Sequence, residues 1–185
     1  MKYGFRYFSY ITEELPDICK QVFQISAKRE DTAIIGASMG GYGALKCALS
    51  KPEQYGWCCA FSSPCLFLKE DLEDFKTKGN TKDFISIFGE QLIRDFQSIF
   101  GEGYAWNPED DIIELAKKVS CQSIKPKIYS SCGTEDPFYS YNRRFRDEMT
   151  ALDPEYTYEE WPGSHDWNFF NEALRKGLNT CFRRM

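Results

Sequence analysis

TAIIGASMGGYGALKCALSKP, residues 32–52, is the stretch of sequence that decides the fold. Residues 32–36 form a short apolar run that predicts a β-strand buried on both faces. Residues 39–50 have helical character, and Pro52 stops them. Between them lies a G-x-S-x-G pattern, residues 36–40. A glycine-rich turn with an incidental serine is the plain alternative, but the position between a strand and a helix favours a sharp turn that displays Ser38 as a nucleophile.

Steric crowding explains why glycines are expected in this turn. A turn this tight holds the serine in a strained backbone conformation, and side chains two residues to either side are expected to clash with the strand or the helix. Gly41 and Gly43 are expected to reduce bulk further where the helix packs on the sheet. The helix N-terminus directs free N–H groups at Ser38, which makes the Met39 N–H a natural donor to an oxyanion.

A serine hydroxyl needs a base to take its proton, and the only histidine of the chain is His165. It lies in WPGSHDW, residues 161–167, a turn-rich loop between the last predicted strand and the last predicted helix. Such loops meet at the carboxyl edge of a parallel sheet, the edge where Ser38 is expected. A loop histidine taken alone is usually a surface residue. The pairing with Ser38 is what favours a catalytic base.

A third residue must orient the imidazole, and in this chain order it is an acid between Ser38 and His165 that follows a strand. Asp136 lies just past the predicted strand at 127–132, in a Gly-Thr-Glu-Asp-Pro turn. Glu135 is its neighbour and the second candidate. Asp166 is better interpreted as a helix cap. An acidic pair in a turn is usually solvated, so only the position of Asp136 gives it weight.

Strands and helices alternate along the rest of the chain, which predicts an α/β fold with a mostly parallel sheet covered by helices on both faces. We expect one domain, residues 1–185, with a helical cap-like insert at 64–121. The aromatic residues of that insert, Phe88 among them, suit either an acyl pocket or a core. Predicted strands lie at 32–36, 56–62, 127–132 and 156–161, and predicted helices at 10–25, 39–50, 108–119 (capped by Asn107), 138–152 and 167–181.

Composition narrows the function classes. The 185 residues are 42% hydrophobic and 28% charged with a net charge of −5, which is typical of a soluble domain and not of a disordered or fibrous chain. The absence of long basic runs disfavours a nucleic-acid partner or an anionic membrane. There is no run of 18 apolar residues, and the first residues lack the pattern of a secretory signal.

Eight cysteines could suggest a disulfide framework, but a chain of this length and apolar content does not need one. There is no C-x-x-C pattern, and a single histidine fails zinc-finger spacing. We interpret the cysteines as mostly reduced, buried thiols of a cytoplasmic protein. Neither a metal nor an organic cofactor is expected.

Four stretches, YITEELP, KREDTAIIGASMGGYGALKCAL, SSCGTEDPFY and PGSHDWNFF, resemble the putative esterase family of α/β hydrolases. This group contains tributyrin esterases, feruloyl and acetylxylan esterases and S-formylglutathione hydrolase, and the chain looks closest to the cytosolic tributyrin-esterase-like members. The resemblance implies Ser38 as nucleophile, Asp136 as orienting acid, His165 as base, and a cap-like insert that fits 64–121. The implied substrate is a small ester of a short-chain acyl or aryl group, and a sugar ester is compatible.

The resemblance departs at the N-terminus, where family members carry further strands and a loop that supplies a second oxyanion donor, typically beside a His-Gly sequence. No His-Gly precedes Ser38 here. With Met39 as the one donor, a rate loss of about 10²–10³ is expected. The strand at 32–36 would then lie at an open apolar edge, which predicts either a homo-oligomer that covers it or poor solubility. A monodisperse monomer in light scattering would contradict this expectation.

Three other readings stay open at this point. The hydrolysed bond could be a thioester of the S-formylglutathione type. The chain could be a non-catalytic remnant that lacks half of the oxyanion hole. A lectin-like carbohydrate binder could use Trp106, Trp161 and Trp167, but two of these flank His165 and are expected to wall the active site instead.

Overall fold

The computed structural model describes residues 6–182, except for the side chains of residues 87 and 88, so the prediction for Phe88 lies outside the described side chains. At its centre is a four-stranded sheet in the order β1-β2-β3-β4, and every neighbouring pair is parallel. All four predicted strands are confirmed to within about two residues. They are β1 (Ala33–Ala37), β2 (Trp57–Phe61), β3 (Lys127–Gly133) and β4 (Thr157–Trp161).

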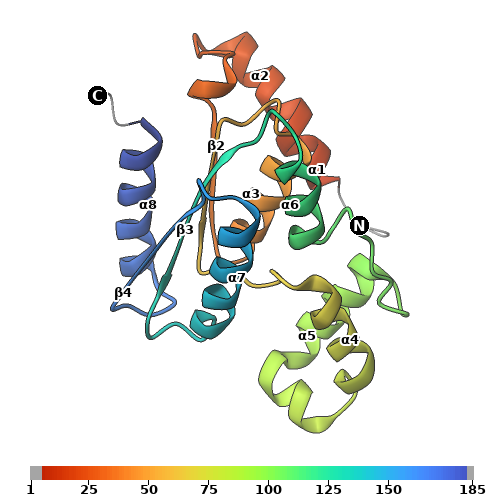
Figure 1. Ribbon diagram of the computed structural model, residues 1–185. Helices are drawn as coiled ribbons and strands as arrows, with labels where there is room; N and C mark the ends of the chain where they lie inside the picture. The colour runs from red at the N-terminus through yellow and green to blue at the C-terminus, as the bar shows by residue number, and fades with distance from the viewer. Residues whose placement is uncertain (1–5, 183–185) are drawn as a thin grey trace.

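Helices cover both faces of the sheet, as the alternation predicts (Figure 1). One face carries α3 (Met39–Ser50), α6 (Ile112–Ser120) and α7 (Tyr139–Leu152), and the other carries α8 (Trp167–Phe182). The side chains of β2 explain the two layers. Cys58 and Ala60 belong to the core beneath α3, whereas Cys59 and Phe61 belong to the core beneath α8. A continuous apolar run is therefore buried on both faces.

Strand β1 differs from its prediction, because all five of its residues are half-buried instead of buried. It lies at one end of the described sheet, so one of its edges has no neighbouring strand among the described residues. An apolar groove of about 280 Å³ runs between β1 and α8, lined by Ile35, Phe61, Phe170 and Leu174 among others. The open edge expected for residues 32–36 is therefore present in the described fold.

The N-terminal helix begins earlier and ends earlier than the predicted range 10–25. It consists of α1 (Tyr7–Ser9), a π-helical turn at Tyr10–Glu14 and α2 (Leu15–Val22). Pro16 cannot donate a backbone hydrogen bond, and the widened turn directly before it accommodates that loss. The apolar stripe is real but not buried, since Ile18 is 51% and Val22 is 67% exposed.

The cap-like insert has a core of its own. Its helices are α4 (Leu68–Lys78) and α5 (Lys82–Phe100), which lie beside the main layers in Figure 1. Gly89, with φ 76°, kinks α5. The aromatic residues of the insert pack mainly on one another, and the Phe75 and Phe96 rings stack at 4.2 Å between centroids. The buried members of this cluster are Leu68, Leu72, Phe75, Phe84, Ile93, Phe96 and Tyr104.

Helix α6 corrects two predictions. Its N-cap is Asp111, not Asn107, because the Asp111 carboxylate accepts the N–H groups of Ile113 and Glu114. Asn107 instead accepts the N–H of Glu109 in the preceding turn. The helix also belongs to the main core beneath the sheet instead of to the insert, so the part with a separate core ends well before residue 121.

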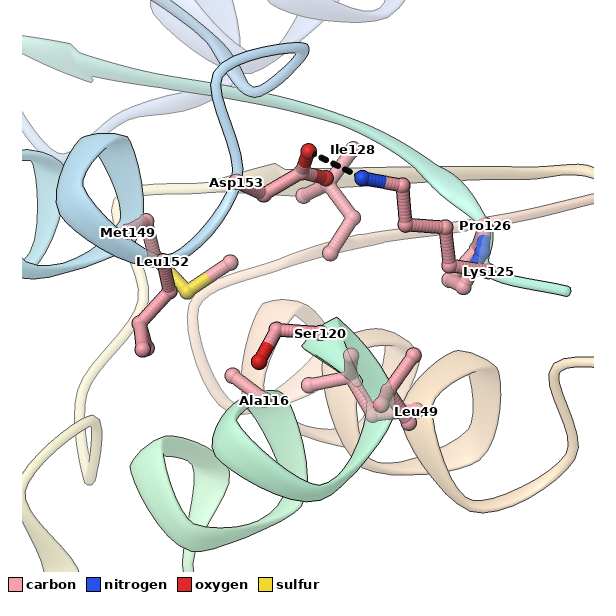
Figure 2. A pocket seen from close by; sticks show the side chains of 10 residues that line it. Leu49, Ala116, Ser120, Lys125, Pro126, Ile128, Met149, Leu152 and Asp153 are labelled. Carbon is pink, nitrogen blue, oxygen red and sulfur yellow. Dashed lines mark hydrogen bonds and ion pairs between the residues drawn. The ribbon is translucent and has the colours of Figure 1, made fainter. Parts of the chain in front are cut away.

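A small crevice marks the end of the main core where β3 begins. Leu49, Ala116, Ile128 and Met149 line it, and its volume is about 10 Å³, which is room for about one water molecule (Figure 2). Lys125 and Asp153 close it with an ion pair of 2.6 Å. It lies near the amino end of β3, opposite the edge at which Ser38 is found, and is too small for a substrate.

Asp71 of α4 fastens the insert to the main layers. Its carboxylate accepts the hydroxyl of Tyr141 on α7 at 2.6 Å, and that hydroxyl accepts the N–H of Phe67. Burial raises the pKa of Asp71 to about 6, although the hydrogen bond from Tyr141 opposes the shift. The folded protein therefore holds this proton to higher pH than the unfolded chain does, in which an aspartate has its ordinary pKa of 3.8.

Between about pH 4 and 6 the folded state binds more protons at Asp71 than the unfolded state, so the stability contributed by this residue is present below pH 4 and lost as the pH rises to 6. Asp71→Asn removes the titration. We expect the variant to be more stable at pH 7 by up to about 3 kcal/mol and equal to the parent near pH 4. Urea unfolding across that range measures the difference.

Glu70→Gln is the matched control, because the hydrogen bond from Arg144 lowers the pKa of exposed Glu70. The stability of this variant relative to the parent should therefore fall as the pH rises, opposite to Asp71→Asn. An Asp71→Asn difference that stays constant with pH would contradict the assignment.

Candidate active site

Ser38 lies at the tip of the turn between β1 and α3. Its backbone has φ 54° and ψ −127°, a conformation that non-glycine residues rarely adopt. The turn is held from both sides, because the Ser38 N–H donates to the Phe61 carbonyl at 2.8 Å and the Ser38 carbonyl accepts the Gly41 N–H at 2.8 Å. The strained backbone is thus fixed by the sheet on one side and by the first turn of the helix on the other.

The steric prediction for the glycines is right for two and wrong for two. A Cβ on Gly36 would lie 2.0 Å from the Gly40 carbonyl oxygen, and one on Gly41 would lie 2.1 Å from Ser63 Oγ. Gly40 and Gly43, by contrast, have nothing within 4 Å of the same position. Gly40 is exposed and Gly43 is half-buried, so the steric requirement for a missing side chain falls on Gly36 and Gly41.

The structure brings Ser38, His165 and Asp136 together in one chain of hydrogen bonds. Ser38 Oγ lies 2.9 Å from His165 Nε2, and His165 Nδ1 lies 2.8 Å from Asp136 Oδ2. The Asp136 side chain is fully buried, whereas the imidazole is 25% exposed. A neutral imidazole that donates Nδ1–H to the carboxylate leaves Nε2 free to accept the hydroxyl proton, which is the arrangement that general-base activation of a serine requires.

The loops after β3 and β4 hold this geometry through their backbones. The Phe138 N–H donates to Asp136 Oδ1 at 2.8 Å, which leaves Oδ2 to face the imidazole. The Glu135 N–H donates to the Gly163 carbonyl at 3.0 Å, and Glu135 itself is exposed. Between the two acidic candidates, Asp136 is the one that meets His165.

Aromatic rings pack against the imidazole of His165. Phe138 and Phe170 meet it edge-on, with ring centroids 5.3 and 5.0 Å away. Asp166 caps α8 by accepting the N–H groups of residues 168 and 169, as predicted. Of the two flanking tryptophans that the sequence predicts to wall the site, Trp161 stacks on Phe169. Trp167 is 84% exposed and contacts Phe170 instead of the imidazole.

Asn142 of α7 lies near the site, and no sequence pattern predicts it there. It is 2% exposed, and its carboxamide accepts the Ser63 N–H and donates to the carbonyls of Ser63 and Phe138. It therefore ties the loop after β2 to the loop that carries Asp136. From the sequence alone, an asparagine in a polar helix is expected at the surface. Only the packing of α7 against the sheet buries Asn142.

Met39 opens α3, so its N–H is one of the donors that the helix leaves without an intrahelical partner. Its side chain, 49% exposed, borders a pocket of about 390 Å³ between α1, α3 and the insert. Apolar side chains from the insert form much of the wall, including Leu68, Phe96 and Phe100. The aromatic residues of the insert thus serve both as a core and as a pocket wall.

Residues that could bind a metal do not gather near this site. Within residues 6–182, no group of three or more histidine, cysteine, aspartate or glutamate side chains is arranged to hold an ion.

The chain is similar to known esterases along most of its length. A family model described as "Esterase: Putative esterase" matches residues 2–181. An acetyl esterase of Caldicellulosiruptor saccharolyticus is 31% identical over 171 residues, which is 89% of this chain and 59% of the relative. This chain therefore spans less than two thirds of that relative's length.

Two solved structures from Staphylococcus aureus share the fold. A fluorophosphonate-binding serine hydrolase superposes with a TM-score of 0.73 at 28% identity, over 98% of this chain and 65% of that one. An S-formylglutathione hydrolase superposes with a TM-score of 0.68 at 26% identity, over 95% of this chain and 60% of that one. The four-stranded sheet and its helices therefore correspond to about three fifths of each solved chain.

Proposed function

The chain belongs to the putative esterase family, and from this premise we propose that it is a serine carboxylesterase that hydrolyses short-chain acyl or aryl esters. The observation that carries the proposal is the continuous contact from Ser38 Oγ through the His165 imidazole to the Asp136 carboxylate. Three residues from three separate loops meet within hydrogen-bond distance, in the order and geometry that acyl transfer requires.

The proposed reaction has two halves. In the first, His165 Nε2 takes the proton of the Ser38 hydroxyl while Oγ attacks the ester carbonyl, and the imidazolium then protonates the departing alcohol. In the second, water attacks the acyl-enzyme with the same imidazole as base, and the acid product leaves. Asp136 stabilises the imidazolium and fixes the ring orientation, and its burial favours a strong interaction at that step.

The negative charge that develops on the carbonyl oxygen needs donors, and the Met39 N–H at the start of α3 supplies one in this proposal. The 390 Å³ pocket beside Met39 supports a small acyl or single-ring group, because its insert wall is apolar. A sugar ester remains compatible, since the alcohol portion would leave toward the exposed side of His165.

A thioester is the second candidate substrate. The superposition on an S-formylglutathione hydrolase favours it, since that protein shares the fold at 26% identity. A serine triad attacks oxygen and sulfur esters by the same steps, so the two substrates differ in the leaving group alone.

We also propose a cytoplasmic protein and a homo-oligomer. All eight cysteines are free thiols, which suits a reducing compartment. Within residues 6–182, no helix has both the length and the apolar character needed to cross a membrane. The apolar groove along the open edge of β1 supports burial against a second copy.

A fluorophosphonate probe tests the nucleophile without a choice of substrate. Activated serine Oγ attacks the phosphorus atom, fluoride leaves, and a stable adduct remains. We expect one adduct per chain, located on Ser38 by peptide mapping, and a labelling rate about 10³-fold or more lower in His165→Ala.

The exposed Ser140 provides a matched control, because Ser140→Ala removes a hydroxyl in the first turn of α7 and must leave labelling unchanged. Labelling that survives Ser38→Ala, or wild-type protein that resists the probe while folded, would contradict the proposed esterase and favour a non-catalytic remnant.

A further inference from the structure

Two thiols outside the candidate active site lie in contact. Cys59 Sγ of β2 and Cys181 Sγ in the last turn of α8 are 3.3 Å apart, although 122 positions separate them in the chain. Cys59 is fully buried and Cys181 is 8% exposed. Both are free thiols. Closing the gap to a sulfur–sulfur bond of about 2.05 Å requires a shift of about 1.2 Å shared by two side chains.

The fold brings these sulfur atoms together through the small residues of α8. Ala173, Gly177 and Cys181 recur every four residues and face the sheet. A Cβ on Gly177 would lie 3.1 Å from Cys59 Sγ, so the missing side chain is what lets the helix approach β2 this closely. The contact is therefore fixed by packing along the helix and not by a loop.

The two thiols differ in exposure and in their hydrogen-bond environment. Either sulfur can donate its S–H to the other. With Cys59 as the donor, the hydrogen bond lowers the pKa of Cys181, and the same hydrogen bond together with burial raises the pKa of Cys59. The thiolate is the attacking species in thiol chemistry. Because Cys181 is also the more exposed of the two, a reagent from solution meets Cys181 first and reaches Cys59 only through it.

We propose that Cys59 and Cys181 form an oxidisable dithiol site whose co-reactant is a small disulfide of the glutathione class. The Cys181 thiolate attacks one sulfur of the reagent, its disulfide bond breaks, and one small thiolate leaves. Cys59 then attacks Cys181 Sγ, the protein disulfide forms, and the second small thiolate leaves with the proton of Cys59. Two protein thiols are oxidised and one small disulfide is reduced to two thiols.

Other cysteines have surroundings that do not favour this reaction. Cys132 lies against the Ser62 hydroxyl at 3.6 Å, and Cys121 is exposed beside the Ser120 hydroxyl at 3.9 Å. Cys121 is open to the same reagent but has a hydroxyl beside it instead of a second thiol. It is expected to stop at a mixed disulfide, which makes it an internal comparison for the pair.

The experiment treats the folded full chain with millimolar glutathione disulfide, quenches it in acid, blocks the remaining thiols and maps the peptides by mass spectrometry. We expect one cross-linked species that joins the peptides of Cys59 and Cys181. The bond closes a very long loop, so thermal unfolding should shift upward by about 5–10 °C and return to the parent value after reduction.

Three variants sharpen the test. Cys59→Ala should stop at a mixed disulfide on Cys181, Cys181→Ala should leave Cys59 unmodified, and Cys121→Ala should cross-link as the parent does. If Cys59→Ala fails to fold, the peptide map of the parent decides alone. Eight unlinked cysteines in the treated parent, or cross-links that involve other cysteines to a similar extent, would overturn the proposal.

Discussion

Ser38→Ala is expected to lower kcat for p-nitrophenyl acetate hydrolysis by about 10⁴–10⁶, which corresponds to about 5–8 kcal/mol of transition-state stabilisation. The alanine keeps the turn but removes the atom that attacks the ester, so the acyl-enzyme cannot form. The imidazole 2.9 Å from Ser38 Oγ then has no hydroxyl proton to take. Initial rates at saturating ester, corrected for spontaneous hydrolysis, measure the ratio.

The size of the ratio also reports on the oxyanion hole. If the Met39 N–H is the only donor in the working protein, the parent rate itself is lower by about 10²–10³ and the ratio falls at the small end of the range. Ser140→Ala must retain the parent rate. Equal rates for Ser38→Ala and the parent would contradict a serine esterase and leave the chain a folded remnant.

Gly36→Ala is expected to be the most destabilising single substitution in the Gly36–Gly40 turn. The new Cβ would lie 2.0 Å from the Gly40 carbonyl oxygen, a backbone atom that cannot move without separating β1 from α3. We expect a loss of about 4 kcal/mol or more, seen as a fall of about 8–16 °C in Tm or as insoluble protein.

Gly40→Ala is its control within the same motif, because a Cβ there meets nothing within 4 Å. On helix propensity alone it should leave the stability unchanged or raise it by up to about 1 kcal/mol. Thermal unfolding followed by circular dichroism compares the two. Similar melting of both variants would show that the steric account of the turn is wrong.

The fold could be predicted where local pattern and burial agree. The run of residues 32–36 and the helix that follows carry their own signals, and both lie where expected. The spacing of Ile18 and Val22 predicts an amphipathic helix, but both side chains are exposed in the structure. Amphipathic spacing shows that one face of a helix is apolar and does not show what packs against that face. The start of α6 was misplaced because Asn107 and Asp111 are equally good caps in sequence, and packing of the helix on the main core selects the second.

The three residues of the candidate site could be predicted from the sequence, but the residue that holds the surrounding loops together could not. Ser38, Asp136 and His165 each follow a strand, and the parallel order of the sheet brings such positions to one edge. Asn142 could not be found in this way, since its partners are backbone atoms of Ser63 and Phe138. Because any residue type offers the same backbone N–H and carbonyl groups, such contacts leave no recognisable pattern in the sequence.

The separate core of the insert has an evolutionary consequence. Its buried rings, such as Phe75 and Phe96, pack on one another and not on the residues beneath the sheet. Mutations that reshape this cluster can therefore accumulate while the bend at Ser38 and the loops around His165 keep their support. Substitutions in the insert would then change the wall of the neighbouring pocket, formed in part by Leu68, Phe96 and Phe100, while the Ser38 turn stays in place.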